Sequence, residues 1–116
     1  MGPNMVFFGW GDVKTGREQM AGQLFGEFVQ YLGGQQQQGM IESFQAVFLD
    51  PHGGDLQGFF LIHGETGKLD ALLNSTAWIT YVTQASLYLN SVGAIRATTG
   101  DVLMERMAVW TSLIPA

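Results

Sequence analysis

The sequence predicts an α+β domain of the ferredoxin-like type, in which helices cover one face of a four-stranded antiparallel sheet and a further helix follows at the C-terminus. Segments with strand and helix patterns alternate along the chain in the order β-α-β-β-α-β. A dense group of turn residues joins the two middle strands. The length of 116 residues is that of one domain, so we expect a single domain over residues 1–116.

The first strand and the first helix are expected in residues 5–34. Residues 5–10 are aromatic and β-branched, which is typical of a strand. Thr15 and Glu18 fit a capping box, so a helix should follow them. Gly33 and Gly34 should end that helix. The apolar residues that recur at helical spacing are Met20, Leu24, Phe28, Tyr31 and Leu32.

The second and third strands are expected to form a hairpin. Residues 40–49 and 57–63 have strand patterns. Between them, residues 50–55 combine Asp, Pro, His and two Gly, which are residues that favour turns. We therefore expect these two strands to be antiparallel neighbours.

The second half of the chain predicts two short helices, a strand and a final helix. The helical segments are residues 66–73 and about 76–85, with Ser75 as the cap of the second. Residues 87–97 should form the fourth strand, interrupted by Gly93. Gly100 and Asp101 then begin the last helix. One face of this helix carries Leu103, Met107, Trp110 and Ile114.

Both faces of the predicted sheet are apolar. In the first strand Val6, Phe8 and Trp10 alternate with Met5 and Phe7. The second strand sets Phe44, Ala46 and Phe48 against Ile41, Val47 and Leu49, and the third sets Phe60 and Ile62 against Phe59 and Leu61. Helices on one side cannot cover the other side, and a monomer seldom exposes so large an apolar patch. The sequence therefore predicts a homodimer that pairs its sheets by two-fold symmetry.

Composition excludes several functions. Five Lys and Arg against ten Asp and Glu give a net charge of −5, which disfavours nucleic acid and anionic membranes as partners. The absence of cysteine excludes disulfides, thiolate metal sites and thiol catalysis. The N-terminus has no signal-peptide pattern, and no apolar run is long enough for a membrane span. We therefore expect a soluble, cytoplasmic protein.

The whole chain resembles the dimeric α/β-barrel superfamily, and most of all a group of small bacterial proteins without an assigned activity. The matching segments are Phe8-Gly9-Trp10-Gly11, Gly16-Arg17-Glu18, Glu42-Ser43-Phe44, the hairpin at 51–60 and the helix after Gly100. The resemblance implies ferredoxin-like protomers that pair their sheets into a barrel. Members of the superfamily include cofactor-free monooxygenases, haem-using enzymes, lactone isomerases and proteins without known chemistry. Fold alone therefore does not assign an activity.

Two histidines are candidates for catalysis. His52 and Asp55 lie in the glycine-rich turn, where a ligand can approach backbone N–H groups and His52 can act as a general base. The same residue types also suit a plain turn. His63 shares the parity of Phe59 and Leu61, so it is either a second candidate base or a hydrogen-bonded residue of an apolar face. Together with Asp50 these side chains match no metal-ligand spacing, so no metal is expected.

Trp10, Trp78 and Tyr81 are candidates for binding a ligand. Trp78 and Tyr81 are three residues apart and share a helix face. In cofactor-free oxygenases of the superfamily, Trp, Tyr and Asn groups hold an aromatic substrate, and these three residues are similar to those groups in residue type only. Their alternative role is packing in the core. Arg17 and Glu18 are expected to be a solvated side chain and a helix cap.

Three functions fit these patterns. The first is a homodimer that binds a small neutral apolar or aromatic ligand in a cavity between helices and sheet, without a cofactor. The second is a cofactor-independent monooxygenase or isomerase that uses His52 or His63. The third is an interaction module that has no ligand. A cavity with convergent polar groups favours the first two, and a solid core favours the third.

Overall fold

Four antiparallel strands form the sheet of this protein, whose structure, a computed structural model, describes residues 2–115. The strands lie in the order β2-β3-β1-β4, and each neighbouring pair is antiparallel. This architecture is α+β and is compatible with the predicted ferredoxin-like arrangement. The strands are β1 (Met5–Trp10), β2 (Ser43–Phe48), β3 (Gly58–His63) and β4 (Gly93–Ala97).

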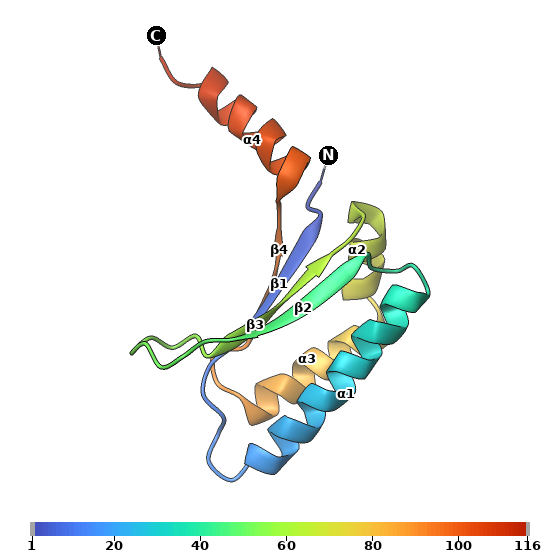
Figure 1. Cartoon of the computed structure of the whole chain (residues 1–116), viewed down its shortest axis with the longest axis vertical. Helices are drawn as coiled ribbons and strands as arrows, with labels where there is room; N and C mark the ends of the chain where they lie inside the picture. The colour runs from blue at the N-terminus through green and yellow to red at the C-terminus, as the bar shows by residue number, and fades with distance from the viewer. Residues whose placement is uncertain (1, 116) are drawn as a thin grey trace.

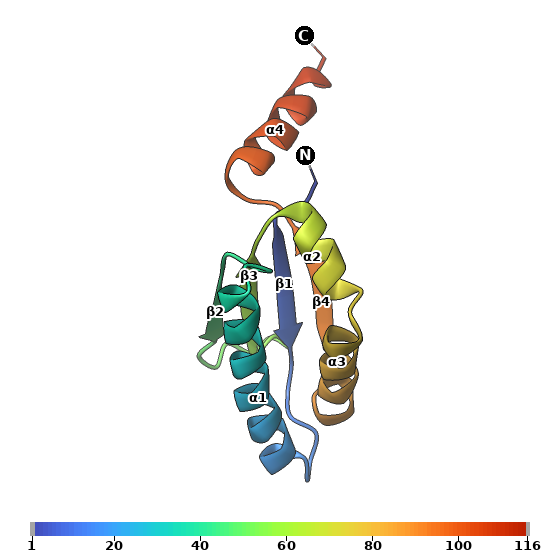
Figure 2. The same ribbon diagram turned by 90° about the vertical axis from the view of Figure 1, so that its right-hand side faces the viewer.

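The first three helices lie on one side of the sheet, and the fourth projects away from it (Figures 1 and 2). Helices α1 and α3 pack side by side, and α2 lies beside them near the start of β1. The described residues thus form two layers, plus an arm that extends beyond the sheet. The helices are α1 (Glu18–Gln37), α2 (Thr66–Leu73), α3 (Thr76–Tyr88) and α4 (Gly100–Ser112).

The core lies between the sheet and helices α1–α3, on what we call the covered face. Register pairs Val6 with Ile62 and Phe8 with Phe60, so one parity of β1 and β3 points toward the helices. These four side chains are buried, and Leu32 of α1 is fully buried among them. Burial of such side chains is the main force that holds helices and sheet together.

The opposite side of the sheet, the open face, has none of helices α1–α3 upon it. Phe7 and Phe59 stack here with their ring centroids 5.0 Å apart. The predicted apolar character of both faces is therefore confirmed for β1 and β3. It is wrong for β2, whose open-face positions include the polar Ser43 and Gln45. The expected Ile41 and Leu49 lie outside that strand.

Helix α1 begins and ends differently from the prediction. Arg17 is the residue before the helix, and no side chain forms a capping hydrogen bond with the first turn. The Glu18 carboxylate accepts a hydrogen bond from the Gly16 N–H at 3.3 Å. The helix also continues through Gly33 and Gly34. It ends before Gly39, whose φ of 76° suits glycine, and the Met40 N–H there donates to the Gln35 carbonyl. Burial of Leu32 outweighs the weak helix propensity of the two glycines.

The fourth strand is shorter than predicted. Residues 87–88 belong to α3, and β4 begins at Gly93 without interruption. The helix extends because Lys14 forms hydrogen bonds with the last carbonyl groups of α3. The Lys14 N–H donates to the Tyr88 carbonyl, and the Lys14 Nζ donates to the Ser86 carbonyl. At the other end of α3 the predicted cap is confirmed, since the Ser75 hydroxyl accepts from the Trp78 N–H at 3.2 Å.

None of the helices within residues 2–115 combines the length and the apolar composition that crossing a bilayer requires.

Candidate functional site

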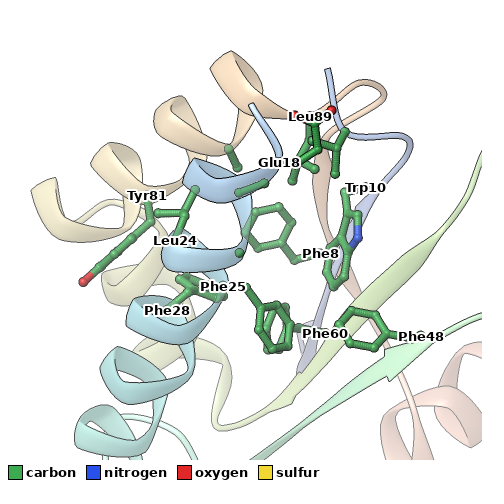
Figure 3. Close-up of a pocket in the computed structure, with 14 residues that line it drawn as sticks. Phe8, Trp10, Glu18, Leu24, Phe25, Phe28, Phe48, Phe60, Tyr81 and Leu89 are labelled. Atoms are coloured by element: carbon green, nitrogen blue, oxygen red, sulfur yellow. The ribbon is translucent and has the colours of Figure 1, made fainter. Parts of the chain in front are cut away.

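An apolar pocket lies between α1, α3 and the end of the covered face where β1 stops (Figure 3). Its volume is about 300 Å³. This size is at the lower end of the range typical of small-molecule sites. The labelled lining residues are Phe8, Trp10, Glu18, Leu24, Phe25, Phe28, Phe48, Phe60, Tyr81 and Leu89.

Small residues leave the pocket open. Glu18, Ala21, Gly22 and Phe25 line it from α1, and their spacing places them on one side of the helix. Ala85 lines it from α3. A side-chain carbon added at Gly22 would meet no atom within 4 Å, so this position borders free space. The pocket thus lies where two packed helices present small residues.

Aromatic rings form the wall against the sheet. The ring centroids of Trp10 and Phe60 are 5.5 Å apart, and those of Phe25 and Phe60 are 5.4 Å apart. Phe48 at the end of β2 lies 5.1 Å from Phe25, yet it is 67% exposed, so it forms part of the rim. These distances lie within the range of favourable ring contacts. The wall is therefore mutually packed and preorganised on its sheet side.

The segment that leads from β1 to α1 closes another side. Gly11 N–H donates to the Asn90 carbonyl at 2.7 Å, and Asn90 N–H donates to the Asp12 carbonyl at 2.8 Å. In the same segment, Val13 and Leu89 form an isolated antiparallel bridge, and both residues line the pocket. Backbone hydrogen bonds therefore tie this wall to the end of α3.

Few polar groups face the pocket. Glu18 is the one charged residue among its lining residues. Figure 3 shows the Tyr81 hydroxyl pointing away from the Phe8 and Phe25 rings, and the Trp10 nitrogen lying on the side away from Phe8. Among residues 2–115, no lysine or arginine lines the pocket, so no cation of these residues would neutralise an anionic ligand there.

Two of the three predicted aromatic ligand contacts reach this pocket. Trp10 and Tyr81 line it. Trp78 is buried behind it, with its ring centroid 5.6 Å from those of Phe8 and Phe28. Trp78 therefore supports the wall from the core rather than forming its surface.

His52 and Asp55 lie in the exposed hairpin loop and do not line the pocket. Both ring nitrogens of His52 have partners within the loop: Nδ1 accepts from the Gly54 N–H at 3.1 Å, and Nε2 lies 2.6 Å from the Leu56 carbonyl oxygen. These contacts assign the proton to Nε2. Gly53, with φ 82°, provides the turn. A catalytic role for His52 stays a prediction.

His63 lies at the end of β3 on the open face, in register with Met5 and Ser43. Its parity with Phe59 and Leu61 is as predicted, and its catalytic role stays a prediction. Within residues 2–115, no three His, Asp or Glu side chains come together in a group that could hold a metal ion.

Sequence reasoning missed most of the pocket's lining. Phe25 and Phe48 were not among the candidate ligand contacts, and Glu18 was expected only to cap a helix. The available signal was the series Glu18, Ala21, Gly22 and Phe25, which predicts a helix stripe with space in its middle. Only the position of α3 shows that this stripe faces a cavity rather than solvent.

One tyrosine near the pocket has a perturbed acidity. Burial raises the pKa of Tyr31 above its ordinary value, a hydrogen bond with Ser75 lowers it, and the neighbouring Tyr81 raises it. The rings of Tyr31 and Tyr81 lie 4.8 Å apart. Tyr81 thus links the pocket lining to a desolvated ring pair between α1 and α3.

Comparisons of the chain with protein-family models, with curated proteins and with solved structures give no match. Function is therefore inferred from the geometry of the pocket and of the sheet, since the fold by itself assigns none.

Proposed function

We propose that this protein binds a small neutral ligand, apolar or ring-containing, in the aromatic pocket, and that it does so as a homodimer like the dimeric α/β-barrel proteins that its sequence resembles. The observation that carries the ligand part is a cavity of about 300 Å³ with aromatic walls and small residues in its lining. No cofactor is invoked.

The volume sets the size of the ligand. A dry apolar cavity of about 150 Å³ holds one benzene molecule. A cavity of about 300 Å³ therefore suits one ring, two fused rings or a short aliphatic chain. Larger molecules would have to extend past the exposed Phe48 at the rim.

The lining sets the charge of the ligand. A carboxylate or phosphate would lose its hydration among aromatic rings and would lie near the Glu18 carboxylate. A neutral ring avoids both costs and gains contact with Trp10, Phe25 and Phe60.

Titration with 2-naphthol and 2-naphthoate tests this selectivity, because the two probes share a ring system and differ in charge at neutral pH. We expect 2-naphthol to quench tryptophan fluorescence saturably, since Trp10 lines the pocket, and to raise the melting temperature. We expect 2-naphthoate to bind at least about tenfold more weakly. Equal binding of the two probes, or no saturable binding, would contradict the proposal.

Two glycine variants locate the binding. Gly22 lines the pocket and Gly26 does not, yet both lie in α1 with no atom within 4 Å of an added side-chain carbon. Gly22→Leu should fill the pocket and weaken 2-naphthol binding by about tenfold or more. Gly26→Leu should leave binding unchanged. If both variants bind like the unmodified chain, the probe binds elsewhere.

The homodimer part rests on the open face. Phe7, Phe59, Leu61 and Ile95 are neighbours across three strands there, and no helix of α1–α3 covers them. A second copy related by two-fold symmetry would bury them. Size-exclusion chromatography with light scattering should give twice the chain mass at micromolar concentration, and a monomer would contradict the dimer while leaving the pocket tests standing.

A further inference from the structure

Helix α4 lacks the packing that a helix of its length needs. Its residues from Leu103 onward are exposed, although many of them are apolar. An isolated helix of this length is marginal in water, so packing against another surface must stabilise it. The large apolar side chains here, between 42% and 76% exposed, are Leu103, Met104, Met107, Val109, Trp110, Leu113 and Ile114.

The exposed apolar side chains include a continuous stripe. Leu103, Met107, Trp110 and Ile114 follow one another at helical spacing and so share one side of α4 and its C-terminal turn. Ser112 lies on the opposite side, about half a turn away from this stripe. An amphipathic pattern of this kind predicts burial of one side.

The helix is held away from its own sheet. The Asn4 side chain forms two hydrogen bonds of 3.0 Å with Thr99, one to the carbonyl and one from the N–H. Val102 is buried and fixes the first turn of α4. In Figure 1 the helix accordingly continues beyond the end of β4, on the side where the sheet carries no helix. This anchor keeps the stripe from the open face of its own subunit.

The open face matches the stripe in chemistry and length. Its strand positions, with Ser43, Gln45 and His63 as the polar ones, include no Asp, Glu, Lys or Arg, so covering it desolvates no such charge. A helix of 13 residues is about 20 Å long, and so is a strand of six residues.

The subunit exposes more surface than a compact monomer does. A chain of 12.7 kDa should expose about 6,200 Å², whereas this one exposes 7231 Å². Its radius of gyration is 16.1 Å, against about 13 Å for a compact domain of this length. The excess area, about 1,000 Å², is close to the roughly 800 Å² that each partner contributes to a stable interface.

We infer that α4 is an arm exchanged between two copies of this chain, each copy packing its Leu103–Met107–Trp110 stripe against the open face of the other. This inference rests on the homodimer part of the proposed function and adds which element forms the interface. A second copy is the occupant because one chain carries both complementary surfaces, and two-fold symmetry satisfies each of them twice.

A charge placed in the stripe tests the role of α4. The double variant Met107→Glu and Trp110→Glu should shift the protein from dimer to monomer by light scattering at micromolar concentration, with the helical circular dichroism of α1–α3 retained. Ser112→Glu, on the opposite side of α4, is the control and should remain dimeric. A double variant as dimeric as the unmodified chain would overturn the exchange and leave the homodimer standing.

Paramagnetic labelling tests where the arm packs, without charging the stripe. The chain has no cysteine, so a nitroxide on Ser112→Cys is the sole label. Subunits with this nitroxide, exchanged with isotope-labelled unmodified subunits, should reduce the amide signals of Phe7, Leu61 and Ile95 in the isotope-labelled partner.

The control label is Gln23→Cys on α1, which is exposed on the far side of the sheet and should leave these three signals unchanged. Signals unaffected by the Ser112 label would overturn the exchange. A monomeric unmodified chain would overturn both the exchange and the homodimer, whereas titration with 2-naphthol would still decide the pocket.

Discussion

The two faces of one sheet differ in how their apolar side chains are satisfied. Phe8 points to the covered face and is buried against Phe28 and Trp78, while its neighbour Phe7 points to the open face and has Phe59 as its ring partner. The covered face is completed by helices α1–α3 of the same subunit, and it also contains the pocket. The open face has none of these helices upon it, and the proposed second copy would cover it. The difference teaches that one face of this sheet is completed within the subunit, while the other is left for the proposed assembly.

The largest expected difference is in unfolding free energy, between a substitution of Phe8 and the same substitution of Phe7. Phe8→Ala leaves a cavity among buried rings and should cost about 3–5 kcal/mol of unfolding free energy. Phe7→Ala should cost less, about 1 kcal/mol in dilute protein, because Phe7 is only partly buried. Urea unfolding measures both values. If the two costs were equal, the contrast between the faces would be wrong.

Alanine substitutions at the two glycines of the paired strands β1 and β3 should show the same difference between the faces, with a smaller change in unfolding free energy. A side-chain carbon at Gly58, on the covered face, would come within 2.8 Å of the Val47 carbonyl and 2.7 Å of the Trp10 ring. For one at Gly9, on the open face, the nearest atoms would be side-chain atoms, at 2.7 Å in the Phe7 ring and at 3.0 Å in Leu56. Gly58→Ala should therefore cost about 1–3 kcal/mol, and Gly9→Ala less, in thermal or urea unfolding.

A substitution in the hairpin loop should have little effect on stability and none on the pocket. His52→Ala removes two contacts within an exposed loop and should cost about 1 kcal/mol or less. The affinity for 2-naphthol should stay the same, since His52 does not line the pocket. A marked loss of affinity in fluorescence titration would move the binding site toward the hairpin.

The smallest effect concerns pH and the desolvated Tyr31. Because burial raises its pKa, the folded state holds the phenolic proton more tightly than the unfolded state does. Its contribution to stability is full below the ordinary pKa of about 10 and is lost as pH rises through the raised value. Tyr31→Phe should therefore reduce the loss of unfolding free energy between about pH 8 and about pH 11 in urea titrations. An identical loss in both proteins would contradict the desolvation.

Local chemistry accounts for the parts of the fold that were predicted correctly. The alternation in residues 5–10 and 57–63, the turn residues between the middle strands and the Ser75 cap each act over a few residues. The predictions at Gly33, Gly34 and residues 87–88 were wrong because distant contacts decide those ends. Burial of Leu32 carries α1 past its glycines, and Lys14 meets the last carbonyls of α3.

The candidate site could be predicted only in part for the same reason. Trp10 and Tyr81 were identified by residue type, and both line the pocket. Phe25 and Phe48 were not, because a phenylalanine in a core and one in a cavity wall have the same local pattern. The small side chains of Gly22 and Ala85 become a cavity only when α1 and α3 face each other.

By itself, the sequence determined the order of the strands and helices, the hairpin, and the apolar character of both parities in β1 and β3. These follow from side-chain periodicity and turn preferences, which act over a few neighbouring residues. Only the tertiary structure decided which parity the helices bury, where the space between them lies, and that α4 points away from its own subunit. Those outcomes depend on contacts between residues far apart in the chain, such as Asn4 with Thr99, whose pairing local patterns do not encode.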